Sequence, residues 1–272
     1  MTLANNDQLR ELCTTVRRDI VEMTAAAGSG HPGGSLSAVE LVVGLYFNVM
    51  RHDPANPTWS DRDRFILSKG HACPVLYSVL ARSGYFPADE LKTLRKFGSR
   101  LQGHPNMQVL PGLDTSSGSL GQGLSISNGL AIAAKLDGKD HRIYCLLGDG
   151  EIQEGQVWEA AMTAAHYKLD NVCAILDYNN LQIDGCCDDV MCIAPVADKW
   201  LAFGWNVIEV DGHNLDEVLL AYQRAASVKC QPTIIIAKTI KGKGVSFMED
   251  VAEWHGKAPN AAELAVALKE LA

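Results

Sequence analysis

The sequence has 272 residues, of which 47% are hydrophobic and 21% are charged, and its formal net charge at pH 7 is −8. These values are ordinary for a folded globular protein, and the acidic balance argues against a nucleic-acid partner or an anionic membrane surface. The sequence shows no apolar stretch of membrane-spanning length and no N-terminal secretion signal, so a cytoplasmic location without membrane attachment is expected.

Helical patterns dominate the first half of the chain. Apolar residues at helical spacing predict an amphipathic helix over residues 7–27 and a second helix that starts near residues 35–37, after a glycine-rich break. A short strand is expected over 64–68, followed by helices near 74–82 and 88–97. A long loop over 98–119 comes next, and loops of this length in a compact domain are usually functional or disordered.

In the second half, strands and helices alternate. Strands are expected over residues 143–147, 172–176, 205–210 and 233–237, and helices up to about 135, over 154–162, 196–204 and 214–227, and from about 260. This alternation predicts an α/β fold with a doubly wound, mostly parallel sheet and helices on both faces. We expect a single domain over residues 1–272.

The eight cysteines show neither a CxxC pair nor a metal-binding spacing. Cys145 and Cys173 fall inside predicted buried strands, where cysteine packs as a small hydrophobic residue. The adjacent Cys186 and Cys187 are interpreted as two loop residues in a reducing compartment.

The strongest functional signal lies at the ends of two predicted strands. Gly148-Asp149-Gly150 ends the strand at 143–147, and Asn179-Asn180 ends the strand at 172–176 after 28 intervening residues. In a parallel sheet these two ends lie at the same edge, where ligands of such folds bind. A carboxylate and an amide oxygen form part of the shell that Mg2+ prefers, so the pair indicates a diphosphate held through a divalent metal. The alternative interpretation is an ordinary turn after a strand.

Four of the eight histidines adjoin a glycine where predicted elements end, namely His31, His71, His104 and His255. Glycine allows the backbone to approach a ligand closely, and histidine binds phosphate or transfers protons near neutral pH. His213 also follows a glycine, but we expect it only to close the turn between a strand and a helix.

Taken together, these motifs closely resemble those of transketolase in their order and approximate spacing. The matching segments are Gly30-His31-Pro32-Gly33-Gly34, Ser68-Lys69-Gly70-His71-Ala72, Gly103-His104-Pro105, Gly118-Ser119-Leu120-Gly121-Gln122-Gly123, Gly148-Asp149-Gly150 and His255-Gly256. The resemblance covers nearly the whole chain, but only the N-terminal, diphosphate-binding module of a full-length transketolase. It therefore implies the N-terminal subunit of a split, two-gene transketolase.

The resemblance also implies how the cofactor, thiamine diphosphate, would be held. Asp149, Asn179 and the backbone carbonyl of Leu181 would bind Mg2+ or Ca2+ on its diphosphate. Further cofactor contacts would come from His71, Gly118, Leu120, Gly150, Glu154 and Lys241. For Lys241, a solvated lysine in a glycine-rich loop is an equally good interpretation.

Three histidines, His31, His104 and His255, would face the sugar substrate as catalytic residues that position hydroxyls and transfer protons. Glu154 and Glu159 would lie where the two kinds of chain meet around the cofactor. The alternative for these two glutamates is the general preference of acidic residues for a helix N-terminus.

The implied reaction is transfer of a two-carbon ketol unit from a ketose phosphate to an aldose phosphate in the pentose phosphate pathway. No residue here matches the glutamate that activates the cofactor in this family. The resemblance therefore implies a C-terminal partner subunit that supplies the pyrimidine-binding module and this glutamate, in a heterotetramer with two copies of each subunit. On this interpretation the chain alone catalyses little.

Several alternatives stay open. One is a split transketolase-like enzyme of a dedicated sugar pathway, and another is a 2-oxo acid dehydrogenase α subunit or a deoxyxylulose-phosphate synthase-like enzyme. A non-catalytic binding module is disfavoured because the motifs are intact. Asn106 and Ser119 stand where many full-length transketolases carry an acidic residue and a proline, so the donor and acceptor sugars are undetermined.

Overall fold

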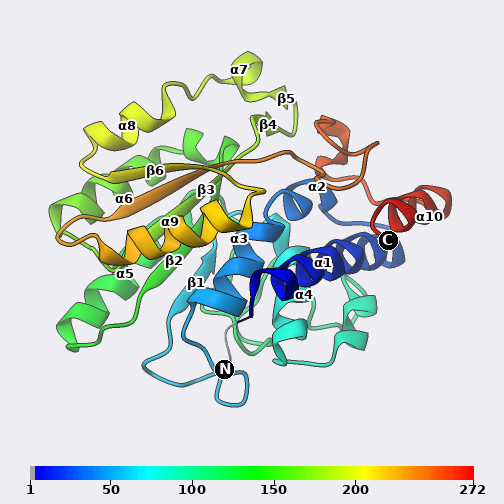
Figure 1. Cartoon of the computed structure of the whole chain (residues 1–272), viewed down its shortest axis with the longest axis horizontal. Coiled ribbons are helices and arrows are strands. Elements are labelled where there is room, and N and C mark those ends of the chain that lie inside the picture. The colour runs from blue at the N-terminus through cyan, green and yellow to red at the C-terminus, as the bar shows by residue number, and fades with distance from the viewer. Residues whose placement is uncertain (1–3) are drawn as a thin grey trace.

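A five-stranded parallel sheet forms the centre of the computed structural model, which describes residues 4–272 (Figure 1). Its strands are β1 (Arg64–Leu67), β2 (Ile143–Gly148), β3 (Val172–Tyr178), β6 (Asn206–Asp211) and β7 (Thr233–Lys238). They are arranged in the order β1-β2-β3-β7-β6, and every neighbouring pair is parallel. The predicted fold class is therefore confirmed.

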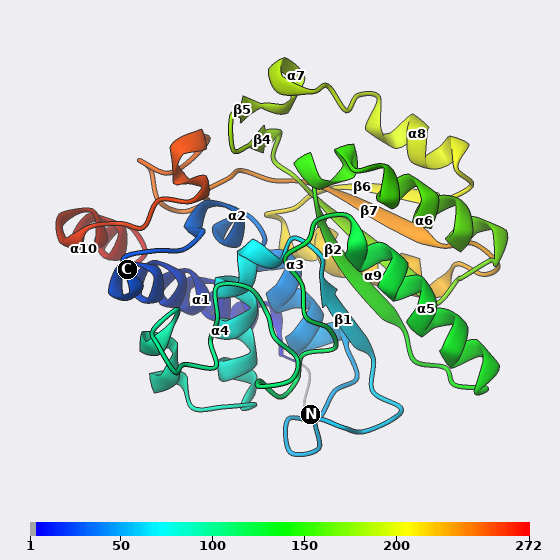
Figure 2. The ribbon, with the colours of Figure 1, turned by 180° about the vertical axis from the view of Figure 1, so that it is seen from behind.

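Alternate residues of β2, β3 and β7 face two separate cores, which explains why these strands are continuous apolar runs in the sequence. On β2, Tyr144 and Leu146 join one core, whereas Ile143, Cys145 and Leu147 join the other. The first core is covered by α1 (Asn6–Ala27), α3 (Val39–Gly44), α4 (Cys73–Ser83) and α9 (Leu215–Ser227). The second is covered by α5 (Gln122–Leu136), α6 (Gly155–His166) and α8 (Val196–Ala202). Figure 2 shows α5 and α6 side by side along one face of the sheet.

The first helix, α1, has clear boundary signals in its sequence. Asn5 and Gln8 form a capping box, in which each side-chain oxygen accepts from the other residue's backbone N–H at 3.0 Å. The helix ends at Gly28, whose φ of 61° is left-handed. The final helix, α10 (Ala261–Glu270), begins with a second capping box between Asn260 and Glu263.

Within residues 4–272, no helix has the length and apolarity that a bilayer crossing requires.

Two predicted helices differ from the structure. The segment 88–97 is a short 3₁₀ turn, Ala88–Thr93, followed by Arg95 with a left-handed φ of 58°, which α-helical backbone cannot contain. The second helix begins earlier than predicted, at Pro32, and is divided into α2 (Pro32–Leu36) and α3, with a π-helical turn after it. Proline is favoured in the first helical turn because its missing N–H has no helical partner to lose there.

One element near the sheet edge was not predicted. A small antiparallel hairpin, β4 (Leu181–Gln182) and β5 (Gly185–Cys186), follows β3 and leads into α7 (Cys187–Val190). These elements are too short to show a periodicity in the sequence. Cys186 and Cys187 therefore lie in a strand and a helix rather than in a loop, and all eight cysteines are free thiols.

Candidate active site

A cavity of about 390 Å³ lies at the edge of the sheet where β1, β2 and β3 end. The sheet register aligns Gly148 of β2 with Asp177 of β3, so the loops after these two strands meet there. The cavity is lined by every residue predicted for the site, namely His31, His71, His104, Gly118, Leu120, Asp149, Gly150, Glu154, Asn179, Leu181, Lys241 and His255. The structure thus gathers residues from near both ends of the chain, from His31 to His255. Glu159 lies outside the cavity lining, exposed on α6.

Asp149 joins the loops after β2 and β3. Its Oδ1 accepts from the N–H of Gly150 at 2.7 Å, and its Oδ2 accepts from the N–H of Asn180 at 2.5 Å. The side chain is buried, and this burial, together with the charge of Asp177, raises the pKa of Asp149 to about 6. A buried carboxylate of this kind is stabilised by a nearby cation.

The neighbouring oxygens suit a hard cation. Asn179 Oδ1 accepts from the N–H of Leu181 at 3.2 Å, and Leu181 itself lines the cavity. Among residues 4–272 no cluster of three His, Cys, Asp or Glu side chains could hold a metal. A divalent ion would therefore combine the Asp149 carboxylate with amide, carbonyl and ligand oxygens, which is the donor set that Mg2+ and Ca2+ accept.

The four glycine-flanked histidines form one cluster. Ring centroids are 5.3 Å apart for His31 and His71, 5.5 Å for His31 and His255, 5.0 Å for His71 and His255, and 6.5 Å for His31 and His104. Burial is the main cause that lowers the pKa of all four, and nearby cationic side chains add to it. The pKa falls to about 4 for His31 and to about 3 for His255. The rings are therefore neutral at physiological pH.

Lys241 reaches this cluster from the loop after β7. It is 2% exposed, and its Nζ donates to the Leu181 carbonyl at 2.8 Å and to Nδ1 of His255 at 2.9 Å. Burial lowers the pKa of Lys241 to about 8. Lys241 is therefore a buried side chain of the site and not a solvated loop lysine.

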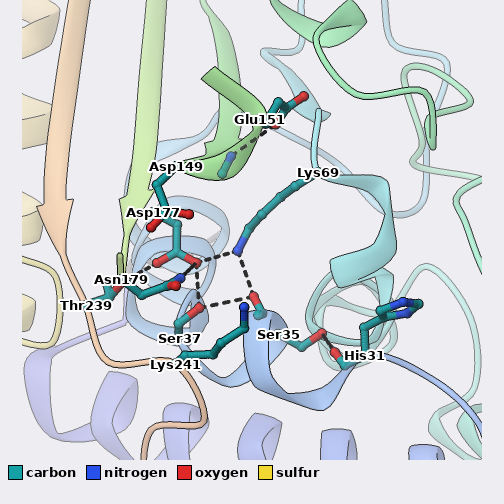
Figure 3. Close-up of polar contacts among 12 residues, drawn as sticks. His31, Ser35, Ser37, Lys69, Asp149, Glu151, Asp177, Asn179, Thr239 and Lys241 are labelled. Carbon is teal, nitrogen blue, oxygen red and sulfur yellow. Dashed lines mark hydrogen bonds and ion pairs between the residues drawn. The ribbon is translucent and has the colours of Figure 1, made fainter. Parts of the chain in front are cut away.

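A buried ion pair between Lys69 and Asp177 supports the cavity, and the sequence patterns give it no role (Figure 3). Lys69 Nζ pairs with Asp177 and donates to the Gly34 carbonyl at 2.7 Å, while the hydroxyls of Ser37 and Thr239 also donate to Asp177. Burial alone would raise the pKa of Asp177, but Lys69 and these hydrogen bonds bring it below its usual value. A carboxylate inside the apolar run of β3 was the available sequence signal for this pair.

Glu151 is a further residue that sequence analysis missed. It is 2% exposed, and its Oε1 accepts from the hydroxyl of Ser68 and, at 2.9 Å, from the N–H of Gly121. Its Oε2 accepts from the N–H of Gly148 at 3.0 Å. One carboxylate therefore joins three cavity loops. Ser68 and Gly121 are remote from Glu151 in sequence, so no spacing indicates that it joins these loops.

Close backbone packing holds the long loop against the histidines. Gly118 has a φ of 144°, and a Cβ at this position would lie 3.2 Å from the ring of His104. A Cβ on Gly70 would lie 2.7 Å from the backbone nitrogen of Gly118. Only glycine fits at either position. The loop over 98–119 is therefore packed closely against the neighbouring backbone and forms one side of the cavity.

The parallel α/β sheet, with an acidic and an amide side chain at adjacent strand ends, has the architecture of a thiamine diphosphate-binding domain. Residues 9–272 match the family model described as transketolase, thiamine diphosphate binding domain. The chain belongs to the transketolase family and corresponds to the N-terminal, thiamine diphosphate-binding part of these enzymes.

Two relatives are separate transketolase subunits of similar length. The 6-deoxy-6-sulfo-D-fructose transketolase subunit of a Clostridium species is 46% identical over 89% of this chain and 88% of its own length. An apulose-4-phosphate transketolase subunit of Phocaeicola vulgatus is 42% identical over 94% of this chain and 90% of its own length.

Full-length transketolases match only over their N-terminal portion. The solved structure of the Campylobacter jejuni enzyme superposes with a TM-score of 0.93 and 35% identity, over 98% of this chain and 43% of that one. The transketolase of Pongo abelii is 45% identical over 92% of this chain and 40% of its own length. This chain thus spans about two-fifths of a full-length transketolase, and the prediction of its family is confirmed.

Proposed function

We propose that this chain is the N-terminal subunit of a split transketolase that transfers a two-carbon ketol unit from a ketose phosphate to an aldose phosphate. The proposal rests on one observation: every predicted site residue lines a single cavity, in a chain of this family. We further propose that residues 1–272 act as one domain in the cytoplasm, with a C-terminal partner subunit in a heterotetramer of two copies each. The partner would supply the pyrimidine-binding module and the glutamate that activates the cofactor.

The residues present fit a bound thiamine diphosphate with its metal. Asp149, Asn179 and the Leu181 carbonyl would hold Mg2+ or Ca2+ through their oxygens. Contacts to the rest of the cofactor would come from His71, Gly118, Leu120, Gly150, Glu154 and Lys241. When bound, the cofactor supplies the electron sink that allows the C2–C3 bond of a ketose to break.

Side chains of this chain would form hydrogen bonds with the sugar hydroxyls and transfer their protons. His31, His104 and His255 are neutral at physiological pH because burial lowers their pKa values, so each ring offers one hydrogen-bond acceptor and one donor. Lys241 donates to Nδ1 of His255, which leaves the ring proton of His255 on Nε2. One ring atom of His255 is thereby kept as a hydrogen-bond donor to the substrate.

A second candidate is a split transketolase of a dedicated sugar pathway. The relatives of similar length support it, because one is named for 6-deoxy-6-sulfo-D-fructose and the other for apulose 4-phosphate. Both donors are ketoses with an anionic end, so the site chemistry proposed here is the same. Only the preferred sugar, and therefore the pathway, differs between the two candidates.

The test is a comparison of ketol donors. The chain would be combined with the product of the neighbouring gene, thiamine diphosphate and Mg2+, with ribose 5-phosphate as acceptor. Xylulose 5-phosphate is expected to be a donor if the enzyme serves the pentose phosphate pathway, whereas faster transfer from apulose 4-phosphate or 6-deoxy-6-sulfofructose would assign it to a dedicated pathway. A complex that binds the cofactor but transfers no ketol unit from any of these donors would contradict the proposal.

A further inference from the structure

A buried cluster of ionic side chains lies beside the loop that carries Lys241, outside the cavity. Arg17 of α1 pairs with Glu40 of α3, with Arg17 Nη2 at 2.6 Å from Glu40 Oε1. His213, in the turn between β6 and α9, lies with Nδ1 at 3.0 Å from the other carboxylate oxygen. Arg17 and Glu40 are 8% and 6% exposed. None of these three residues lines the cavity, and the proposed chemistry uses none of them.

The remaining hydrogen bonds of the cluster go to the backbone on either side of Lys241. His213 Nε2 accepts from the N–H of Ile240 at 2.8 Å, and Arg17 Nε donates to the carbonyl of Lys243 at 3.1 Å. A backbone N–H can only donate, so Nε2 carries no proton and Nδ1–H donates to Glu40. The orientation of the imidazole is therefore set from both of its nitrogens.

The loop is also held from its other side. The N–H of Gly242 donates to the carbonyl of Gly33 at 3.0 Å, and the N–H of Asp250 donates to the carbonyl of Lys241 at 3.0 Å. A Cβ on Gly33 would lie 3.1 Å from Cγ of Lys241, and one on Gly242 would lie 2.3 Å from the carbonyl oxygen of Met248. The backbone is closely packed at both glycines, and the Lys241 side chain extends from this loop into the cavity.

Stability alone does not account for this cluster. Taking charged groups out of water is costly, and a well-packed apolar cluster of similar volume is often as stable or more stable. Buried ionic groups are kept in some proteins because they specify one geometry. Lysine has a long flexible side chain, so its Nζ has a defined position only if the backbone that carries it is fixed.

We propose that Arg17, Glu40 and His213 form a positioning unit that sets the place of Lys241 Nζ in the cavity and affects cofactor binding only through Lys241. The proposal rests on the proposed function of the cavity, in which Lys241 contacts the cofactor. The unit ties α1, α3 and the β6–α9 turn to a loop that none of these elements adjoins in sequence.

A double-mutant cycle tests this proposal. The dissociation constant of thiamine diphosphate in the presence of Mg2+ would be measured by calorimetry on the chain combined with its partner subunit. The variants are Lys241→Met, Glu40→Gln and the combination of both, with His166→Ala, an exposed histidine at the end of α6, as the matched control. In Glu40→Gln the amide must turn its NH2 group toward either Arg17 or His213, both of which are donors, so the cluster is broken without a change of volume.

Lys241→Met is expected to weaken binding by about 10- to 100-fold, the worth of a hydrogen bond to a charged group. Glu40→Gln is expected to weaken it by about fivefold or more in the wild-type background, and by less than about twofold when Lys241 is already Met. If the two single variants' losses of thiamine diphosphate affinity instead multiply in the double variant, Glu40 acts independently of Lys241. That result would overturn the positioning unit and leave the proposed function intact. No loss in Lys241→Met would instead refute the cofactor role of Lys241, and the positioning unit with it.

A second variant and a second readout guard against misfolding. His213→Gln keeps an amide oxygen that can accept from the N–H of Ile240, so it is expected to retain more affinity than His213→Ala; equal losses would contradict the proposal. Acetylation of Lys241 by acetic anhydride, followed by mass spectrometry on the cofactor-free complex, is expected to be faster in Glu40→Gln than in the wild type. An unchanged rate would show that the cluster does not hold Lys241 in place.

Discussion

Replacing Glu151 by alanine is expected to destabilise the chain strongly, because one carboxylate satisfies donors from three loops. The change would remove Glu151 as the acceptor for the buried N–H of Gly121 and for the half-buried N–H of Gly148. An unpaired buried group costs about 1–3 kcal/mol and a half-buried one less, so the free energy of unfolding should fall by at least about 1–3 kcal/mol. The hydroxyl of Ser68 can rotate to another acceptor and is left out of this sum.

Urea unfolding of the isolated chain measures this loss. Glu151→Gln should be milder than Glu151→Ala, because the amide oxygen can still accept from one of the two N–H groups. Glu11→Ala, an exposed glutamate on α1, is the matched control and should change the free energy of unfolding by no more than about 0.5 kcal/mol. A loss below about 1 kcal/mol in Glu151→Ala, with an unchanged dependence on urea, would refute this account of how the loops are joined.

Three further predictions concern the cofactor site and the histidines. Asp149→Ala should abolish metal-dependent binding of thiamine diphosphate, because it removes the only carboxylate of the proposed metal ligands; unchanged binding by calorimetry would refute the metal assignment. His104→Ala should lower turnover about 100-fold or more, as expected on loss of a proton-transfer group, with cofactor affinity nearly intact. A large loss of affinity would instead place His104 in the diphosphate shell. Burial and Lys241 lower the pKa of His255 from 6.5 to about 3, so unfolding at pH 4–6 takes up a proton there. The free energy of unfolding should therefore fall as the pH drops below about 6.5, and less steeply in His255→Gln; parallel pH profiles would contradict this.

Much of the fold was predictable because its elements carry strong local signals. The buried strands β2, β3 and β7 appear in the sequence as apolar runs, and α1 has an amphipathic pattern with a cap at each end. The composition of the segment after Pro87 favours a helix, whereas Arg95 has left-handed backbone and its N–H donates to the carbonyl of Leu101 at 2.8 Å. The β4–β5 hairpin is two residues per strand, too short to leave a pattern.

Which residues come together at the site could be predicted only in part. Residues at strand ends, such as Asp149 and Asn179, were found because parallel topology brings strand ends together. The roles of Glu151 and His213 were not found for a common reason: partners such as Gly121 and Ile240 come from segments far away in the sequence. Hydrogen bonds of this kind depend on packing between loops, and no spacing along the chain records them.

The most direct test of the central claim is a reconstitution titration. The chain would be held at a fixed concentration with thiamine diphosphate and Mg2+, and ketol transfer from xylulose 5-phosphate to ribose 5-phosphate would be followed as the partner is added. The account predicts no significant transfer by either protein on its own and a rate that saturates at one partner per chain. It also predicts no transfer when the activating glutamate of the partner is replaced. Full activity of this chain without a partner would contradict the claim that it provides only the diphosphate-binding half of the active site.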